Sequence, residues 1–185
     1  TWVHTHKIND LKEVQYKSRC VVQGFRQIAN EHYDTSKVSS PVIELSIIRL
    51  LTAIAVEYEW PIHHLDISSA YLHADIDYEK SIFVKPPPGS NIDSGKCWQL
   101  NKSVYGMKQA GYMWYQCITK VLMDLNFEPD TAISGMFCKY FGENKKLIVA
   151  LYVDDMFLTS SNITILNDFK LELAKHFDLK YFADI

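Results

Sequence analysis

The stretch "KLIVALYVDDMFLTSS", residues 146–161, has the composition of buried β-strands, yet Asp154 and Asp155 lie side by side in its middle. An isolated carboxylate in an apolar core is costly, and two neighbouring carboxylates also repel each other. Three arrangements would make the pair tolerable: a solvated turn, ion pairs with Lys or Arg, or a bound divalent cation. The pair taken alone favours the turn, because Asp is common in turns.

A third carboxylate changes this balance. Asp66, in "HHLDISSAY", also lies at the end of an apolar strand pattern. Neighbouring antiparallel strands can bring Asp66 next to the pair, although the two segments are far apart in the sequence. Three carboxylates on a sheet surface suit oxygen-seeking cations such as Mg²⁺, and two such ions can clamp the oxygens of a phosphoryl transfer.

The composition is that of an ordinary globular protein. The chain has 185 residues, of which 48% are hydrophobic and 13% aromatic. This length suits one compact domain or two small subdomains with a real core. The net charge of −3 argues against a generally basic nucleic-acid binder but leaves room for a local basic patch. The sequence has no membrane-spanning run and no signal-peptide pattern. It also lacks an initiating Met, so we expect a fragment or a processed product.

The cysteines and the adjacent histidines favour structural roles. Four cysteines are widely spaced without a CxxC pair, which predicts buried thiols in a reducing compartment rather than a zinc site or disulfides. His63 and His64 are neighbours on a predicted strand, so their side chains should point to opposite faces. We therefore expect one buried and one exposed histidine, not a joint metal site.

Periodicity predicts a mixed chain of helices and strands. In residues 41–60 apolar positions recur at helical spacing, at Val42, Leu45, Ile48, Leu51 and Ala55, after a start at Ser40–Pro41. Asn162 is a candidate N-cap for a later helix. The expected helices are 41–60, 111–125 and 162–177. The expected strands are 1–8, 14–25, 61–76 with a turn near Ser68, 81–84, 97–100, 136–141, 145–155, its continuation 156–161 after a tight turn at the acidic pair, and 178–185. This order predicts an α+β fold with an antiparallel sheet covered by helices.

Five ordered blocks resemble one family. "YVDD" resembles the catalytic hairpin of reverse transcriptases, and "LDISSAYLHADI" resembles their first catalytic block. "LNKSVYGMKQAGYMWY" is similar to the block that follows it in copia-type (Pseudoviridae) LTR retrotransposons. "YKSRCVVQGFRQ" and "SPVIELSIIRLLTAIAVEYEW" are similar to the fingers strand and following helix of that group. One YxDD is a weak signal, but five blocks in order over nearly the whole chain are specific.

The resemblance implies a fold and the residue bounds of its parts. It implies a reverse-transcriptase-like fragment of fingers and palm in a single domain over residues 1–185, with the thumb absent. Residues 1 to about 40 would form the fingers hairpin and its loop, and the rest of the fingers and the palm would interleave over 41–185.

The resemblance also implies catalytic residues. Asp66, Asp154 and Asp155 would hold two Mg²⁺ ions, for which Mn²⁺ can substitute. One ion would activate the primer 3′-hydroxyl, and the other would neutralise the triphosphate and the departing pyrophosphate. The second aspartate of such pairs can sit slightly behind the first, so Asp155 is the weaker candidate for a close ligand.

Four further residues match the family's nucleotide site. Lys17 and Arg19 alternate on one strand face and would contact the triphosphate, although spacing alone favours a solvated face. Tyr71 matches an aromatic steric gate that excludes a 2′-hydroxyl, and without the resemblance it would be a core tyrosine. Gln109 opens a predicted helix and matches a glutamine near the incoming nucleotide.

The function that follows is RNA-directed DNA polymerase, in the core of a copia-like polyprotein. Its partners would be an RNA or DNA template with primer, deoxynucleoside triphosphates and the integrase and RNase H regions, in a cytoplasmic virus-like particle or the nucleus. Without a thumb we expect weak or no activity from the chain alone, because affinity for nucleic acid depends on the number of phosphate contacts. One alternative is a silent retroelement remnant that serves as an interaction module. Another is a metal-dependent nuclease, for which Tyr71, Lys17 and Arg19 have no clear use.

Overall fold

The computed structural model describes residues 1–8, 12–76, 81–93 and 95–181. The chain forms two compact units, each assembled from two separate segments. One unit combines Thr1–Ser39 with Tyr71–Trp114, and the other combines Ser40–Ala70 with Tyr115–Ile185. The chain therefore passes from one unit to the other more than once, and each unit depends on contacts between distant parts of the sequence.

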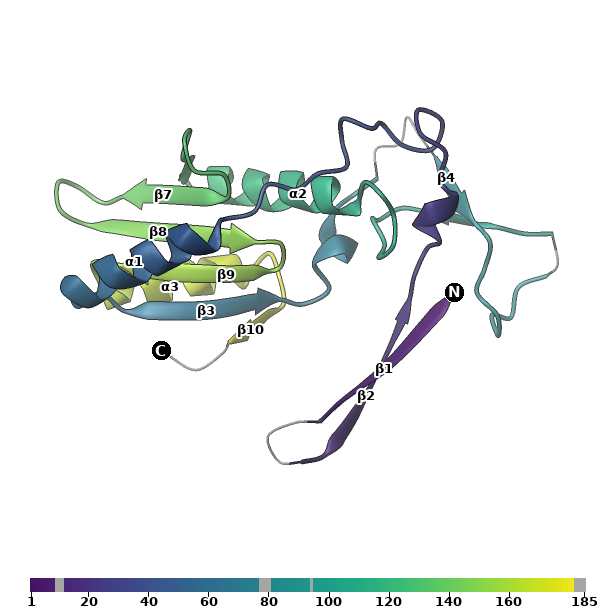
Figure 1. Ribbon diagram of the computed structural model, residues 1–185, viewed down its shortest axis with the longest axis horizontal. Coiled ribbons are helices and arrows are strands. Elements are labelled where there is room, and N and C mark those ends of the chain that lie inside the picture. The colour runs from purple at the N-terminus through teal and green to yellow at the C-terminus, as the bar shows by residue number, and fades with distance from the viewer. Residues whose placement is uncertain (9–11, 77–80, 94, 182–185) are drawn as a thin grey trace. The chain divides into compact units, whose positions relative to one another are not determined.

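The second unit contains an antiparallel sheet of six strands in the order β10-β3-β9-β8-β7-β6 (Figure 1). Its strands are β3 (Ile62–Ile67), β6 (Glu128–Pro129), β7 (Met136–Tyr140), β8 (Lys146–Tyr152), β9 (Asp155–Ser160) and β10 (Leu179–Tyr181). The central strand β8 is apolar at consecutive positions because both of its faces are covered. The expected antiparallel sheet is confirmed, and β6 is a strand that the sequence pattern did not predict.

Helices cover this sheet on both faces. Helix α1 (Leu45–Glu57) packs through Leu51 against a cluster that includes Ile148 and Ala150 of β8. Helix α3 (Ile163–Leu173) lies behind the sheet and contacts β9. Neighbouring residues of β8 point to opposite faces, so a helix on each side buries both sets.

Helix α1 begins later than its periodicity predicts. The expected start was Pro41, but the helix begins at Leu45. The preceding residues follow the sheet instead, because the Ile43 amide donates to the Leu151 carbonyl at 3.0 Å. Leu51 and Ala55 are buried as expected, whereas Leu45 is 63% exposed.

The other helix boundaries agree better with the pattern. Asn162 caps α3 as predicted, because its side chain accepts hydrogen bonds from the amides of Thr164 and Ile165. Helix α2 spans Ala110–Asp124, one residue earlier at each end than expected.

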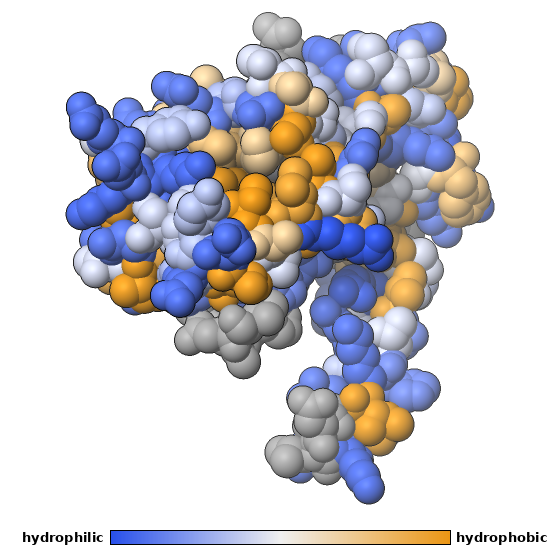
Figure 2. All heavy atoms as spheres, turned by 60° about the vertical axis from the view of Figure 1, so that its left-hand side comes forward, coloured by the Kyte–Doolittle hydropathy of each residue, from blue (hydrophilic) through white to orange (hydrophobic). Residues whose placement is uncertain are grey.

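Apolar side chains also remain on the surface (Figure 2), as is normal for a globular chain, and α1 contributes Leu50 and Val56 to them. None of the described helices is long and apolar enough to cross a membrane.

The first unit is built from short elements. They are the antiparallel hairpin of β1 (Trp2–Ile8) and β2 (Val14–Cys20), the 3₁₀ turn η1 (Gly24–Arg26), the pair β4 (Ile82–Val84) and β5 (Trp98–Leu100), and part of a second 3₁₀ turn, η2 (Ala70–His73). Its apolar cluster centres on Ile76, Met107 and Ala110.

Strand β2 stops before the predicted end at Phe25. Beyond Cys20 the chain leaves the hairpin, and the Val22 amide donates to the Tyr105 carbonyl at 2.8 Å. Gly24 then passes so close to Gly106 that a Cβ on Gly24 would lie 1.9 Å from the Gly106 carbonyl oxygen. Contacts with a distant loop, which local alternation does not encode, therefore end this strand.

The cysteines differ from expectation in their burial. All four are free thiols, but Cys97 is exposed and Cys20, Cys117 and Cys138 are half-buried. The prediction of buried thiols is therefore wrong for Cys97. Burial, helped by the nearby carboxylates of Asp130 and Glu128, raises the pKa of the Cys138 thiol, although Lys146 opposes the shift.

Gly135 provides a test of the junction between the sheet and the segment that precedes α1. Its φ is +77°, and an added Cβ would lie 2.8 Å from the Ile43 nitrogen and 2.9 Å from the Leu151 oxygen. We expect Gly135→Ala to lower the free energy of unfolding by about 3 kcal/mol, because the backbone must also move. Gly142→Ala, at φ +73° in open space, should cost only about 1–2 kcal/mol. Urea unfolding followed by circular dichroism measures both, and equal losses would contradict this account of the junction.

Thiol chemistry provides a second test. The thiolate is the reactive form, so the raised pKa and partial burial of Cys138 should slow its alkylation. We expect iodoacetamide at pH 8 to modify Cys97 first and Cys138 far more slowly, as followed by peptide mass spectrometry. Cys138 modification as fast as that of Cys97 in the folded protein, with both equally fast in urea, would contradict the described burial.

Candidate active site

The acidic pair lies at the tip of the hairpin formed by β8 and β9. Tyr152 and Asp155 close the hairpin as partners, so Val153 and Asp154 form the turn. Val153 has a φ of +57°, which is unfavourable for a β-branched residue and is typical of a constrained turn. The Ile67 amide donates to the Asp154 carbonyl at 2.9 Å, which ties the turn to the end of β3.

Strand register brings the third aspartate to the pair. Asp66 of β3 lies directly opposite Asp155 of β9, and Lys180 of β10 lies directly opposite Asp66. Directly opposed residues of antiparallel strands share a face. Lys180, Asp66, Asp155 and Tyr152 therefore form one row, which we call the carboxylate row. The row crosses the neighbouring strands β10, β3, β9 and β8 (Figure 1). The prediction that neighbouring strands bring Asp66 next to the pair is confirmed.

The carboxylates have solvent access and basic neighbours. The side chain of Asp66 is 24% exposed and that of Asp155 is 47% exposed. The Lys180 ammonium lies 3.4 Å from Asp66 Oδ1, and His64 Nε2 lies 2.9 Å from Asp155 Oδ1. The pair therefore lies at a turn with solvent access, as one of the three arrangements predicts, and the basic partner of Asp155 is a histidine rather than Lys or Arg.

The donor chemistry of the site suits a hard divalent cation. Asp66 and Asp155 face each other from adjacent strands, and Asp154 is next along the chain, so carboxylate oxygens from two strands are available. In the part of the chain that the structure describes, however, no three His, Cys, Asp or Glu side chains are arranged so that they could hold a metal ion. The residue types fit Mg²⁺, and a shift of side chains would be needed to bind it.

The adjacent histidines point to opposite faces as predicted. His63 is only 6% exposed, and its Nδ1 lies 2.8 Å from the ammonium of Lys170 in α3. His64 is half-buried rather than fully exposed, because it contacts Asp155 in the carboxylate row. This contact with a candidate catalytic residue was not predicted.

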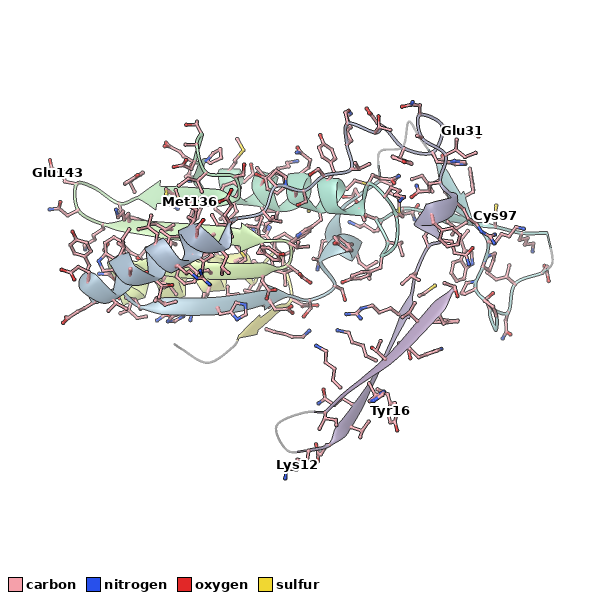
Figure 3. All side chains as sticks on the ribbon, in the orientation of Figure 1. Lys12, Tyr16, Glu31, Cys97, Met136 and Glu143 are labelled. Atoms are coloured by element: carbon pink, nitrogen blue, oxygen red, sulfur yellow. The ribbon has the colours of Figure 1, made fainter. Side chains whose placement is uncertain are left out.

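The four candidate nucleotide residues belong to the other unit. Lys17 and Arg19 lie on the same face of β2, opposite Thr5 and Val3 of β1, as their alternation predicts. Neither strand of this hairpin contains an acidic residue. Side chains project from both sides of the hairpin (Figure 3), and Lys17 is exposed whereas Arg19 is half-buried.

Tyr71 and Gln109 are more enclosed. The Tyr71 ring packs edge-on against Tyr105 with ring centroids 4.8 Å apart, at the border of the apolar cluster of this unit. Gln109 is 7% exposed; its amide accepts a hydrogen bond from Gln27 at 3.0 Å and donates to the His32 carbonyl at 3.4 Å. Gln109 directly precedes α2 rather than opening it.

Two further residues at these sites were not predicted from the sequence. Tyr105 lies between two candidate nucleotide residues, since its ring contacts Tyr71 and the Arg19 guanidinium lies 5.6 Å from its centroid. Lys180 belongs to the carboxylate row. The signal available for Lys180 was the same as for Asp66, a charged residue in a short apolar strand pattern.

Comparison with known proteins agrees with this geometry. The family described as reverse transcriptase (RNA-dependent DNA polymerase) matches residues 1–185. The chain belongs to the reverse transcriptase family. This match confirms the resemblance drawn from the five sequence blocks.

Similar proteins place the chain in the copia-type branch of reverse transcriptases. It is 33% identical over 176 residues to the retrovirus-related Pol polyprotein from transposon TNT 1-94 of Nicotiana tabacum, a match that covers 94% of the chain and 13% of the relative. The corresponding polyproteins from transposons RE1 and RE2 of Arabidopsis thaliana are 30% identical over 183 residues and 29% identical over 188 residues, with 97% and 100% of the chain and 12% of each relative covered. The chain thus spans about an eighth of the length of these curated relatives.

Proposed function

We propose that this chain is the nucleotidyl-transfer core of an RNA-directed DNA polymerase, carried within a retrotransposon Pol polyprotein. The observation that supports the proposal most directly is the register that sets Asp66 opposite Asp155, with Asp154 in the adjoining turn. The site lies in a chain whose whole length matches the reverse transcriptase family. Its substrates would be a primer on an RNA or DNA template and deoxynucleoside triphosphates, inside a virus-like particle or the nucleus.

In this proposal Asp66, Asp154 and Asp155 hold two Mg²⁺ ions, and Mn²⁺ can substitute. When bound, such cations activate the primer 3′-hydroxyl and neutralise charge on the triphosphate and the leaving pyrophosphate. The protein contributes rigid placement. Asp66 and Asp155 are anchored on paired strands inside the six-stranded sheet, and the hydrogen bond from Ile67 holds the turn that carries Asp154.

The fingers hairpin, β1–β2, would receive the nucleotide. Lys17 and Arg19 share a strand face and would bind the triphosphate oxygens, where Arg can form two parallel hydrogen bonds. Tyr71 would exclude a 2′-hydroxyl, and its packing against Tyr105 supports the role because the ring is held from one side. Gln109 would lie near the incoming nucleotide, with Gln27 holding its amide.

The alternative function, a silent remnant that serves as an interaction module, has less support. Such a remnant is under no constraint to keep three aspartates, yet all three are present and two of them face each other in register. We therefore favour the enzyme. Alone, without further parts of the polyprotein, we expect the chain to polymerise weakly or not at all.

Primer extension tests the catalytic assignment. The protein is the chain together with its natural C-terminal continuation, and the substrate is poly(rA)/oligo(dT) with dTTP and Mg²⁺ or Mn²⁺. We expect Asp66→Asn and Asp154→Asn each to reduce incorporation by at least about 100-fold, because a direct ion ligand is lost. Asp168→Asn, on the exposed side of α3, is the matched control and should retain full activity. If Asp66→Asn were as active as the parent protein, the assignment of Asp66 as a catalytic residue would be wrong.

The kinetics of single-nucleotide incorporation test the hairpin. Losing a charge-assisted hydrogen bond to phosphate should raise the KM for dTTP about tenfold in Lys17→Ala and in Arg19→Ala. Lys175→Ala, which removes a lysine paired with Glu172 at 2.6 Å on the other unit, should leave this KM unchanged. If both hairpin variants kept the parent KM, the triphosphate role of this strand face would be wrong.

A further inference from the structure

We propose that Lys180 is a built-in competitor for divalent cations, holding Asp66 in the metal-free protein and lowering the affinity of the carboxylate row for metal. This inference rests on the proposed function, because it assumes that Asp66 is a metal ligand. It concerns a residue of β10, a short strand at the edge of the sheet, to which the catalytic assignment gives no role.

The position of Lys180 is fixed by the backbone and not only by its flexible side chain. β10 pairs with β3 so that Leu179 lies opposite Ile67 and Lys180 lies opposite Asp66. The Ser68 amide donates to the Asp178 carbonyl at 2.9 Å, directly before the strand begins. Leu179 is half-buried and Lys180 is exposed, so a slip of one residue would exchange their faces. The pairing of β10 with β3 therefore places the positive charge of Lys180 beside Asp66.

The ion pair between Lys180 and Asp66 contributes too little to the stability of the fold to explain why a lysine lies at this position. The Lys180 ammonium is 3.4 Å from Asp66 Oδ1, and its side chain is 58% exposed. Solvent-exposed ion pairs contribute little to folding. A fixed positive charge beside a metal ligand acts differently, because it both occupies a ligand oxygen and repels a doubly charged ion.

The other facing carboxylate of the carboxylate row, Asp155, also has a basic neighbour. His64 contacts Asp155 on the neighbouring strand, so both facing carboxylates have a basic partner before any ion arrives. Among the described residues no three donors are arranged as a ready metal site. Binding of a cation at Asp66 would require the Lys180 ammonium to swing out toward solvent, which its exposure permits.

The size of the effect follows from electrostatics. A unit charge about 5–7 Å from a divalent ion in a water-like dielectric, reduced by salt, changes the ion's affinity by roughly three- to tenfold. Removing the charge of Lys180 should therefore tighten cation binding by that factor. If Lys180 instead served to orient Asp66 for the metal, its removal would weaken binding.

The test measures Mn²⁺ affinity directly, by the loss of the free-ion electron paramagnetic resonance signal on titration, without nucleotide or template. We expect Lys180→Met and Lys180→Gln to bind Mn²⁺ three- to tenfold more tightly than the parent chain. Lys175→Met is the matched control, since it breaks a surface ion pair with Glu172 outside the carboxylate row, and should not change the Kd. Matching thermal unfolding midpoints would show that the Lys180 variants are folded.

Asp66→Asn separates this inference from the proposed function. It should weaken Mn²⁺ binding, and in Asp66→Asn/Lys180→Met the gain from removing Lys180 should fall below about twofold, because the paired residues are coupled. If Asp66→Asn weakened binding but both Lys180 variants bound like the parent or less tightly, the competitor role would be overturned and the metal site would stand. If Asp66→Asn bound Mn²⁺ like the parent, the metal assignment would fail and the inference with it.

Discussion

The antiparallel pairing of β3 with β9 is the constraint on which the candidate site depends. A shift of one residue would turn the facing side chains to the other side of the sheet. Leu65 and Met156 oppose each other one position further along and are fully buried, so burial on that face holds the register. The same register sets Asp66 opposite Asp155 on the other face. Apolar packing on one side of the sheet thus positions the charges on the other.

The carboxylates are tolerated because they lie where the apolar strands end. The turn at Val153–Asp154 reaches solvent, and the neighbouring strands supply Lys180 and His64. A buried carboxylate without such partners would be costly. As a result, an oxygen of each facing carboxylate is already in contact with a basic group.

Much of the fold was predictable from local pattern. The hairpin at residues 146–161, the strands around Asp66 and the cap at Asn162 appear where alternation, turn residues and capping chemistry predict them. The errors cluster where distant backbone groups compete with local preference. Strand β2 stops early because Val22 bonds to Tyr105, and α1 starts late because Ile43 bonds to Leu151. Neither partner can be read from the residues nearby.

For the site, the sequence by itself determined the chemistry: three aspartates in apolar strand patterns, two cations alternating on a strand, and the order of blocks that marks a reverse transcriptase. Only the tertiary structure decided which groups meet. It placed Lys180 beside Asp66, His64 beside Asp155 and Tyr105 between Tyr71 and Arg19. The physical reason is that side-chain type is local, whereas the pairing of strands distant in sequence is set by the packing of whole faces.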